Sequence, residues 1–164
     1  MTIFVKNKHT LQIEEFKFKC CIGEKGSTKN KKEGDKKTPI GVFEIENLYF
    51  RKDRKNKPST LLKCVEIKKN MVWCNDVKNK QNYNRLIKIN RLTNYEILFR
   101  KDYKYDYFIP IMYNTNPTVI GKGSAIFIHL TKNYLGTAGC VALNRKDFKI
   151  LIKIINKDTK IKIF

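Results

Sequence analysis

The sequence is poor in histidine, in paired cysteines and in long apolar runs, and each shortage excludes a class of protein. Its 164 residues contain two histidines, and the five cysteines form no C-x-x-C pair, so the usual spacing of zinc ligands is missing. The odd cysteine count excludes a disulfide framework and favours a reducing compartment. No apolar run approaches membrane-spanning length, and the first one is too short for a secretory signal. We therefore expect a cytoplasmic chain as written, or a periplasmic one if a leader has been removed.

Acidic residues are also few, and the charge is strongly unbalanced. The chain has 35 basic and 15 acidic residues, a formal net charge of +20. Such an excess suggests an anionic partner, such as nucleic acid, a membrane surface or a cell-wall polymer. Only six of the basic residues are arginine, and the lysines are spread along the chain. A sequence rich in lysine, asparagine and isoleucine is also typical of AT-rich coding, so the charge alone does not establish a nucleic-acid partner.

Apolar residues alternate with polar ones in the first third of the chain, which predicts β-strands. TIFV and TLQIEEFKFKCCIG flank a turn at Asn7 and Lys8 and predict a hairpin, with His9 exposed in its turn. Further strands are predicted at residues 38–50, 60–67, 95–99, 107–113 and 125–130.

A helix is predicted near the C-terminus, followed by a short strand TKIKIF. Asn144 can cap it, and one face carries four apolar residues: Phe148, Leu151, Ile152 and Ile155. We expect a single, mainly β domain over residues 1–164 with this one helix.

His129 and Cys140 stand eleven positions apart, after the last apolar run. A catalytic cysteine attacks as its thiolate, so it needs an imidazole, exposed amides or a helix N-terminus nearby. His129 ends a predicted strand, the amides of Gly139 and Cys140 can form an oxyanion hole in an exposed turn, and the helix after Asn144 can supply its dipole. The alternative is a buried structural cysteine with a histidine that ends a strand.

Two blocks of sequence resemble a known enzyme family. TPIGVF, residues 38–43, is similar to a T-P-x-G-x-F motif, and IFIHL followed by TAGCVAL is similar to a strand-borne histidine before an [ST]-H-G-C turn. Both motifs are typical of the L,D-transpeptidase catalytic domain, the YkuD family of peptidoglycan cysteine acyltransferases. WCND, YNRLI and GKGSAIF resemble a compact, divergent Gram-negative branch. The resemblance implies a two-sheet β-sandwich with the cysteine at the mouth of a cleft, which the segments 24–37, 51–60 or 73–85 can cover as a lid.

The resemblance also implies roles for individual residues. Cys140 is the nucleophile and His129 is the base that takes its proton. The main-chain carbonyl of Leu130 orients the imidazole, and Gly139 is the turn glycine. Thr137, which opens the turn, is expected to meet the substrate.

The chain departs from the family pattern at three points. Ala138 replaces the usual histidine of the turn, Ala142 stands where an arginine is common, and the histidine-to-cysteine spacing is shorter. Because polar groups that hold substrate are lost, another cation should meet its carboxylates. We expect Arg85 in this role, since a guanidinium binds a carboxylate through two parallel hydrogen bonds, although a surface arginine is the alternative. Four neighbours in sequence are expected to line the same pocket: Trp73, Asp76, Tyr83 and Asn84.

The reaction implied by the resemblance is acyl transfer on peptidoglycan stem peptides that contain meso-diaminopimelate, through a thioester on Cys140. The acceptor is an amine in a transpeptidase and water in an L,D-carboxypeptidase, which is the natural role for a cytoplasmic enzyme of muropeptide recycling. Neither a metal nor an organic cofactor is required. We expect a monomer without a membrane segment or specific nucleic-acid partner, and a basic nucleic-acid-binding module is the more distant alternative.

Overall fold

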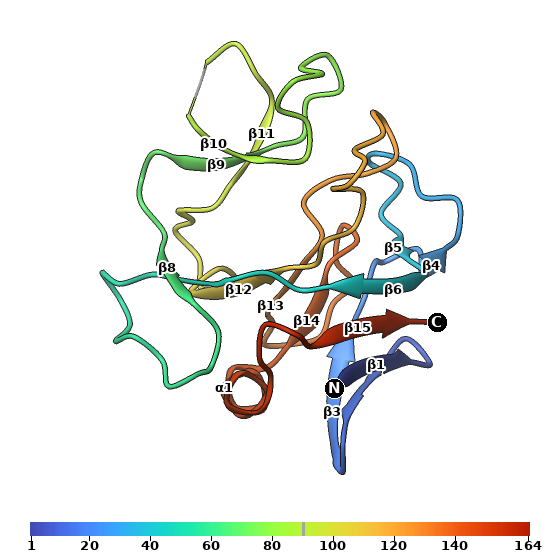
Figure 1. The fold of residues 1–164 in the computed structure, drawn as a ribbon, viewed down its shortest axis with the longest axis vertical. Coiled ribbons are helices and arrows are strands. Elements are labelled where there is room, and N and C mark those ends of the chain that lie inside the picture. Colours follow the sequence, from blue (N-terminus) through green and yellow to red (C-terminus); the bar gives the residue numbers. More distant parts are fainter. Residues whose placement is uncertain (90) are drawn as a thin grey trace.

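The computed structural model describes residues 1–89 and 91–164, which form a mainly β fold with one helix (Figure 1). The elements in chain order are β1 (Thr2–Lys6), β2 (Thr10–Ile13), β3 (Phe16–Cys21), β4 (Ser27–Thr28), β5 (Thr38–Pro39), β6 (Gly41–Glu44), β7 (Leu48–Phe50), β8 (Cys64–Glu66), β9 (Met71–Cys74), β10 (Leu86–Lys88), β11 (Tyr95–Ile97), β12 (Tyr107–Pro110), β13 (Phe127–Leu130), β14 (Val141–Leu143), α1 (Arg145–Ile154) and β15 (Lys160–Ile163). Among the described residues, no helix is long and apolar enough to cross a membrane.

Most strands belong to one ten-stranded sheet that curls on itself. Its order is β6-β15-β1-β2-β3-β14-β13-β12-β7-β8. An antiparallel bridge between Ile45 and Ile111 joins the chain leaving β6 to the end of β12, and the Glu46 N–H donates to the Pro110 carbonyl at 3.0 Å. The predicted mainly β fold with one helix after Cys140 is confirmed, and its two layers are the halves of this curled sheet.

The main hydrophobic core lies between the two halves of the sheet and α1. Asn144 caps the helix, as predicted, by accepting the Asp147 N–H at 2.9 Å. The core cluster contains side chains of β1, β2, β12, β13 and β14 together with the predicted apolar face of α1: Phe148, Leu151, Ile152 and Ile155. The 3.6-residue period of this segment therefore locates both the helix and its buried face.

The first hairpin forms where the sequence predicts it, but the second alternating run is broken by an extra turn. Asn7 and Lys8 adopt positive φ values of 51° and 61° between β1 and β2, and His9 is exposed. Glu14, with φ 47°, makes a further turn, so β2 and β3 pair antiparallel instead of forming one strand. Glu14 and Glu15 interrupt the alternation, and the apolar positions pass from odd to even numbers after them, so the sequence does contain a signal of this turn.

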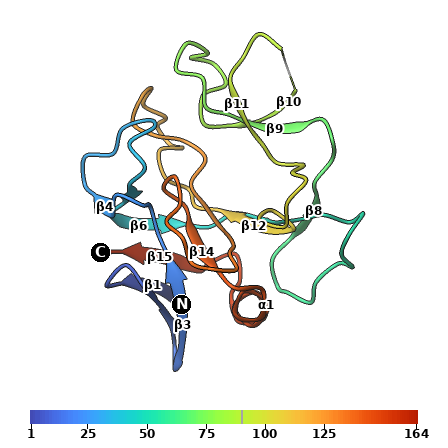
Figure 2. The same cartoon turned by 180° about the vertical axis from the view of Figure 1, so that it is seen from behind.

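A smaller sheet, β10-β9-β11, forms a separate lobe at the opposite end of the molecule from α1 (Figures 1 and 2). A second hydrophobic cluster joins this lobe to the main sheet. It contains Trp73 of β9, Phe108 and Phe127 of the main sheet, Tyr105 and Cys140. The predicted nucleophile therefore lies at the junction between lobe and main sheet.

Candidate active site

Two neighbouring parallel strands place His129 and Cys140 on one face of the sheet. β13 pairs with β14 so that Ile128 lies opposite Val141 and His129 opposite Ala142. Side chains alternate along a strand, so Cys140 shares the face of His129 and is offset from it by two residue pairs. Ala142 is thus the immediate cross-strand neighbour of the imidazole.

The thiol of Cys140 is enclosed by the main chain that leads into β13. Its sulfur accepts the Phe127 N–H at 3.3 Å, and the thiol donates to the Ala125 carbonyl, also at 3.3 Å. Only 7% of Cys140 is exposed, so the expected exposed turn is wrong for this side chain. Burial raises the pKa of Cys140 to about 12, although the Phe127 N–H acts in the opposite direction. The resting thiol is therefore neutral at pH 7.

The helix dipole does not reach this thiol, contrary to the sequence-based expectation. The three residues of β14 and the cap residue Asn144 separate Cys140 from the first helical residue, Arg145. A strand rises by about 3.3 Å per residue, so β14 alone carries the chain roughly 10 Å before the cap residue Asn144 and the helix start. Since the dipole acts mainly within the first turn, any lowering of the Cys140 pKa must come from other groups.

His129 is held as a neutral base. Its Nδ1 lies 3.0 Å from the carbonyl oxygen of Leu130. Because a carbonyl oxygen can only accept, Nδ1 carries the hydrogen and Nε2 keeps a free lone pair. Burial lowers the pKa of His129 to about 4, while the Leu130 contact acts in the opposite direction. The main-chain contact that the family resemblance implies is therefore present.

Several hydrogen bonds hold the turn before Cys140, and the turn requires glycine at position 139. Gly139 has φ 140°, and a Cβ there would lie 2.9 Å from the carbonyl oxygen of Lys37. The hydroxyl of Thr38 donates to the Gly139 carbonyl at 2.8 Å, which joins the TPIGVF block to the nucleophile turn. Thr137 accepts the Gly139 N–H at 3.1 Å and donates to the Cys140 carbonyl at 2.6 Å. The Gly139 amide, expected in the oxyanion hole, is thus occupied by Thr137.

His129 and Cys140 both line a cleft of about 580 Å³, a volume typical of small-ligand sites. Thr137 and Ala138 lie on its wall. Of the segments expected to cover the cleft, residues 24–37 contribute several lining residues and residues 73–85 contribute Asn75, whereas residues 52–59 line a different cavity.

Trp73 and Asn84 do not line the cleft, but they contact residues beside it. The Trp73 indole packs edge-on against Phe127 and donates to Asn84 Oδ1 at 3.0 Å. The same oxygen accepts the Ala125 N–H at 3.1 Å, and the Asn84 amide group donates to two further carbonyls, at 2.9 and 2.8 Å. Asn84 therefore fixes the segment whose carbonyl accepts the Cys140 thiol.

Tyr83 and Asp76 are also structural in this geometry, since neither lines the cleft. The Tyr83 hydroxyl donates to Glu33 and accepts the Gly123 N–H at 3.1 Å. Ser124 donates to the same Glu33 carboxylate at 2.6 Å, so residues 24–37 are anchored along the cleft. Asp76 accepts main-chain N–H groups of its own lobe, which lowers its pKa.

Arg85 lies away from the cleft, and a different arginine borders it. The Arg85 side chain is exposed and is not among the lining residues, whereas Arg100 lines the cleft. Arg100 pairs with Asp102 through two hydrogen bonds of 2.9 and 2.6 Å and lies 3.6 Å from Glu96. The chain has only six arginines, so Arg100 could have been considered from the sequence. Arg85 was favoured instead because it lies within the YNRLI segment and close to WCND.

Two further residues line the cleft but lie outside the sequence motifs. Tyr105 is buried, contacts the His129 ring edge-on at 5.4 Å and donates to Glu96 at 2.9 Å. Glu96 lies on the cleft wall beside it. Within residues 1–89 and 91–164, no group of three or more His, Cys, Asp and Glu side chains could hold a metal ion.

The fold and the cleft define a class of domain in which a thiol and a neutral imidazole sit on adjacent parallel strands of a curled sheet. A family model of the L,D-transpeptidase catalytic domain (YkuD) matches residues 1–163. The chain belongs to this family.

Solved structures of similar fold include proteins from two bacteria. The helical cell shape determining protein Pgp2 from Campylobacter jejuni matches with a TM-score of 0.53 and 17% identity over 99% of this chain. Bd1075 from Bdellovibrio bacteriovorus matches with a TM-score of 0.51 and 17% identity over 99% of this chain. This chain spans 46% and 47% of those two chains, respectively. No curated protein matches significantly.

Proposed function

We propose that residues 1–164 form a single catalytic domain that transfers acyl groups on peptidoglycan stem peptides containing meso-diaminopimelate. Cys140 Sγ attacks the carbonyl carbon of that residue while its proton passes to His129 Nε2. The C–N bond then breaks, the proton leaves with the departing amino acid, and a thioester remains. An amine or water next attacks the thioester and restores the thiol.

The observation that carries this proposal is the fixed tautomer of His129 on the face that holds Cys140. The Leu130 carbonyl, 3.0 Å from Nδ1, keeps Nε2 available as a base. Because burial raises the pKa of Cys140 to about 12 and lowers that of His129 to about 4, thiol and imidazole are both neutral at rest. Proton transfer therefore has to accompany attack on the substrate, which is general-base catalysis.

The charges on the cleft wall support a zwitterionic substrate. Arg100 supplies a guanidinium on the wall of the cleft, which Ala142 also lines where the family usually has an arginine, and it replaces Arg85 as our candidate for a substrate carboxylate. Glu96 supplies a carboxylate beside it, 3.6 Å from Arg100. A carboxylate in the cleft favours an ammonium group on the acceptor, so we place the transpeptidase ahead of the L,D-carboxypeptidase.

Incubation with a purified tetrapeptide muropeptide, with and without a second muropeptide as amine acceptor, tests the reaction. Mass spectrometry distinguishes a cross-linked dimer from a trimmed tripeptide. We expect Cys140→Ala to abolish both products and His129→Ala to slow acylation by about two to four orders of magnitude. Cys64→Ala, which removes a thiol outside the cleft, is the matched control and should remain active. Product formation by Cys140→Ala would refute the proposal.

A further inference from the structure

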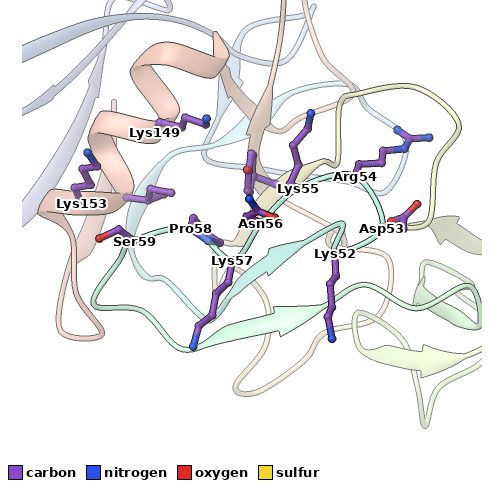
Figure 3. Close-up of a pocket in the computed structure, with 12 residues that line it drawn as sticks. Lys52, Asp53, Arg54, Lys55, Asn56, Lys57, Pro58, Ser59, Lys149 and Lys153 are labelled. Atoms are coloured by element: carbon purple, nitrogen blue, oxygen red, sulfur yellow. The ribbon is translucent and has the colours of Figure 1, made fainter.

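A second cavity lies between residues 52–59 and the exposed face of α1 (Figure 3). Its volume is about 690 Å³, within the range of small-ligand sites, and it is partly open to solvent. Among the described residues, none lines both this cavity and the cleft of Cys140. Tyr107 and Ile152 are buried to 3% and 1% exposure and line its inner side. The site is therefore concave and separate from the proposed acyl-transfer chemistry.

The lining of this cavity is strongly basic. Its only acidic residue, within the described part of the chain, is Asp53, whose two carboxylate oxygens each accept from Arg51 at 2.7 Å. That carboxylate is already neutralised by a guanidinium from outside the cavity. Six lining residues are basic: Lys52, Arg54, Lys55, Lys57, Lys149 and Lys153.

Three of these cations have partners and three do not. Arg54 and Lys55 approach Asp106 at 3.2 and 3.9 Å, and Lys52 approaches Glu66 at 3.8 Å. The other three are exposed and form no ion pair within the described residues: Lys57, Lys149 and Lys153.

The three unpaired lysines come from two segments that are far apart in the chain. Lys149 and Lys153 lie one turn apart on α1, so their like charges repel, and Lys57 adds a third from the opposite side of the cavity. A concave group of like charges concentrates the electrostatic potential and attracts a compact anion.

We propose that this cavity binds a compact ligand with two or more phosphate groups, either free or as the headgroup of a lipid. Lysine ammonium groups bind phosphate as point charges, and one phosphate is too little charge for three unpaired lysines. The concave shape and limited volume favour a compact ligand, because duplex nucleic acid contacts proteins along an extended basic surface.

The probe for the free ligand is inorganic tripolyphosphate, titrated into the full chain by calorimetry at 150 mM NaCl. The test variant is Lys57→Gln/Lys149→Gln/Lys153→Gln. The matched control, Lys17→Gln/Lys68→Gln/Lys69→Gln, removes the same charge from exposed positions outside the cavity. With roughly threefold lost per exposed lysine, we expect binding about 30-fold weaker in the test variant and within about twofold of wild type in the control.

Vesicles of cardiolipin in phosphatidylcholine, in which each cardiolipin headgroup carries two phosphates, and a random DNA duplex complete the experiment. Lysine-dependent vesicle binding without tripolyphosphate binding would support the headgroup form of the proposal. Equal weakening in both triple variants would show that net charge alone attracts the anion and would overturn it, as would no binding of either phosphate probe. Duplex binding that depends on the same three lysines and displaces tripolyphosphate would replace the compact ligand with nucleic acid. The single variant Lys57→Glu leaves the sequence of α1 unchanged, so weaker tripolyphosphate binding by this variant cannot come from a damaged helix.

Discussion

Burial of a neutral imidazole should make the stability of this protein depend on pH between about 6.5 and 4. Burial lowers the pKa of His129 from 6.5 to about 4. Because the folded pKa is the lower one, the unfolded chain takes up this proton first as the pH falls. The folded state therefore loses stability below pH 6.5 and loses no more from this group below pH 4.

The size of the loss follows from the two pKa values. One pKa unit corresponds to about 1.4 kcal/mol, so His129 should cost about 2 kcal/mol of unfolding free energy between pH 7 and pH 5. The full loss at pH 4 and below approaches about 3 kcal/mol. In urea, with a slope near 2 kcal/mol per molar, the step from pH 7 to pH 5 shifts the midpoint by about 1 M.

Urea unfolding of three proteins at both pH values isolates this contribution. His129→Gln removes the buried titrating group and should reduce the shift between pH 7 and pH 5 by about 1 M. His9→Gln removes the other histidine, from an exposed turn, and should keep the wild-type shift. If wild type and His129→Gln lose stability in parallel, the reasoning about a buried neutral imidazole is refuted.

Three other consequences of the geometry can be measured. Iodoacetamide should label Cys64, the least buried cysteine, before Cys140, whose pKa burial raises to about 12; peptide mapping that finds Cys140 first would contradict this order. Gly139→Ala should destabilise the fold by about 1 to 3 kcal/mol and disable the turn, whereas Gly34→Ala, with positive φ but no atom within 4 Å of the added Cβ, should cost less in thermal unfolding. Asn84→Ala removes a buried amide with four hydrogen bonds and should cost about 2 to 4 kcal/mol; a loss below 1 kcal/mol in denaturant titration would show that Asn84 does not fix the segment beside Cys140.

Local patterns located much of the fold. The alternation in residues 2–13 and the apolar face of α1 are each produced by neighbours in the chain, so their periods predict strand and helix directly. The turn at Glu14 was missed although Glu14 and Glu15 interrupt the alternation, and the short strand β14 was missed because its three residues are all apolar. A periodic pattern reports which residues are buried but does not report where the chain reverses.

The candidate site, like the fold, could be predicted from the sequence only in part. The IFIHL and TAGCVAL blocks predicted Cys140, His129 and the Leu130 carbonyl as site groups, since these positions lie within short motifs. The pocket residues were placed by sequence proximity, which put Arg85 near the substrate, while the fold places Arg100 on the cleft wall. Distance along the chain is a poor guide here because β9, β10 and β11 form a separate lobe.

The sequence by itself determined the family motifs, the mainly β class and the helix cap at Asn144, because each depends on residues close together in the chain. Only the tertiary structure decided the protonation states of Cys140 and His129, because desolvation depends on segments folded over them. The same holds for the basic cavity. Lysines that appear dispersed in the sequence line one cavity there, since α1 packs beside residues 52–59.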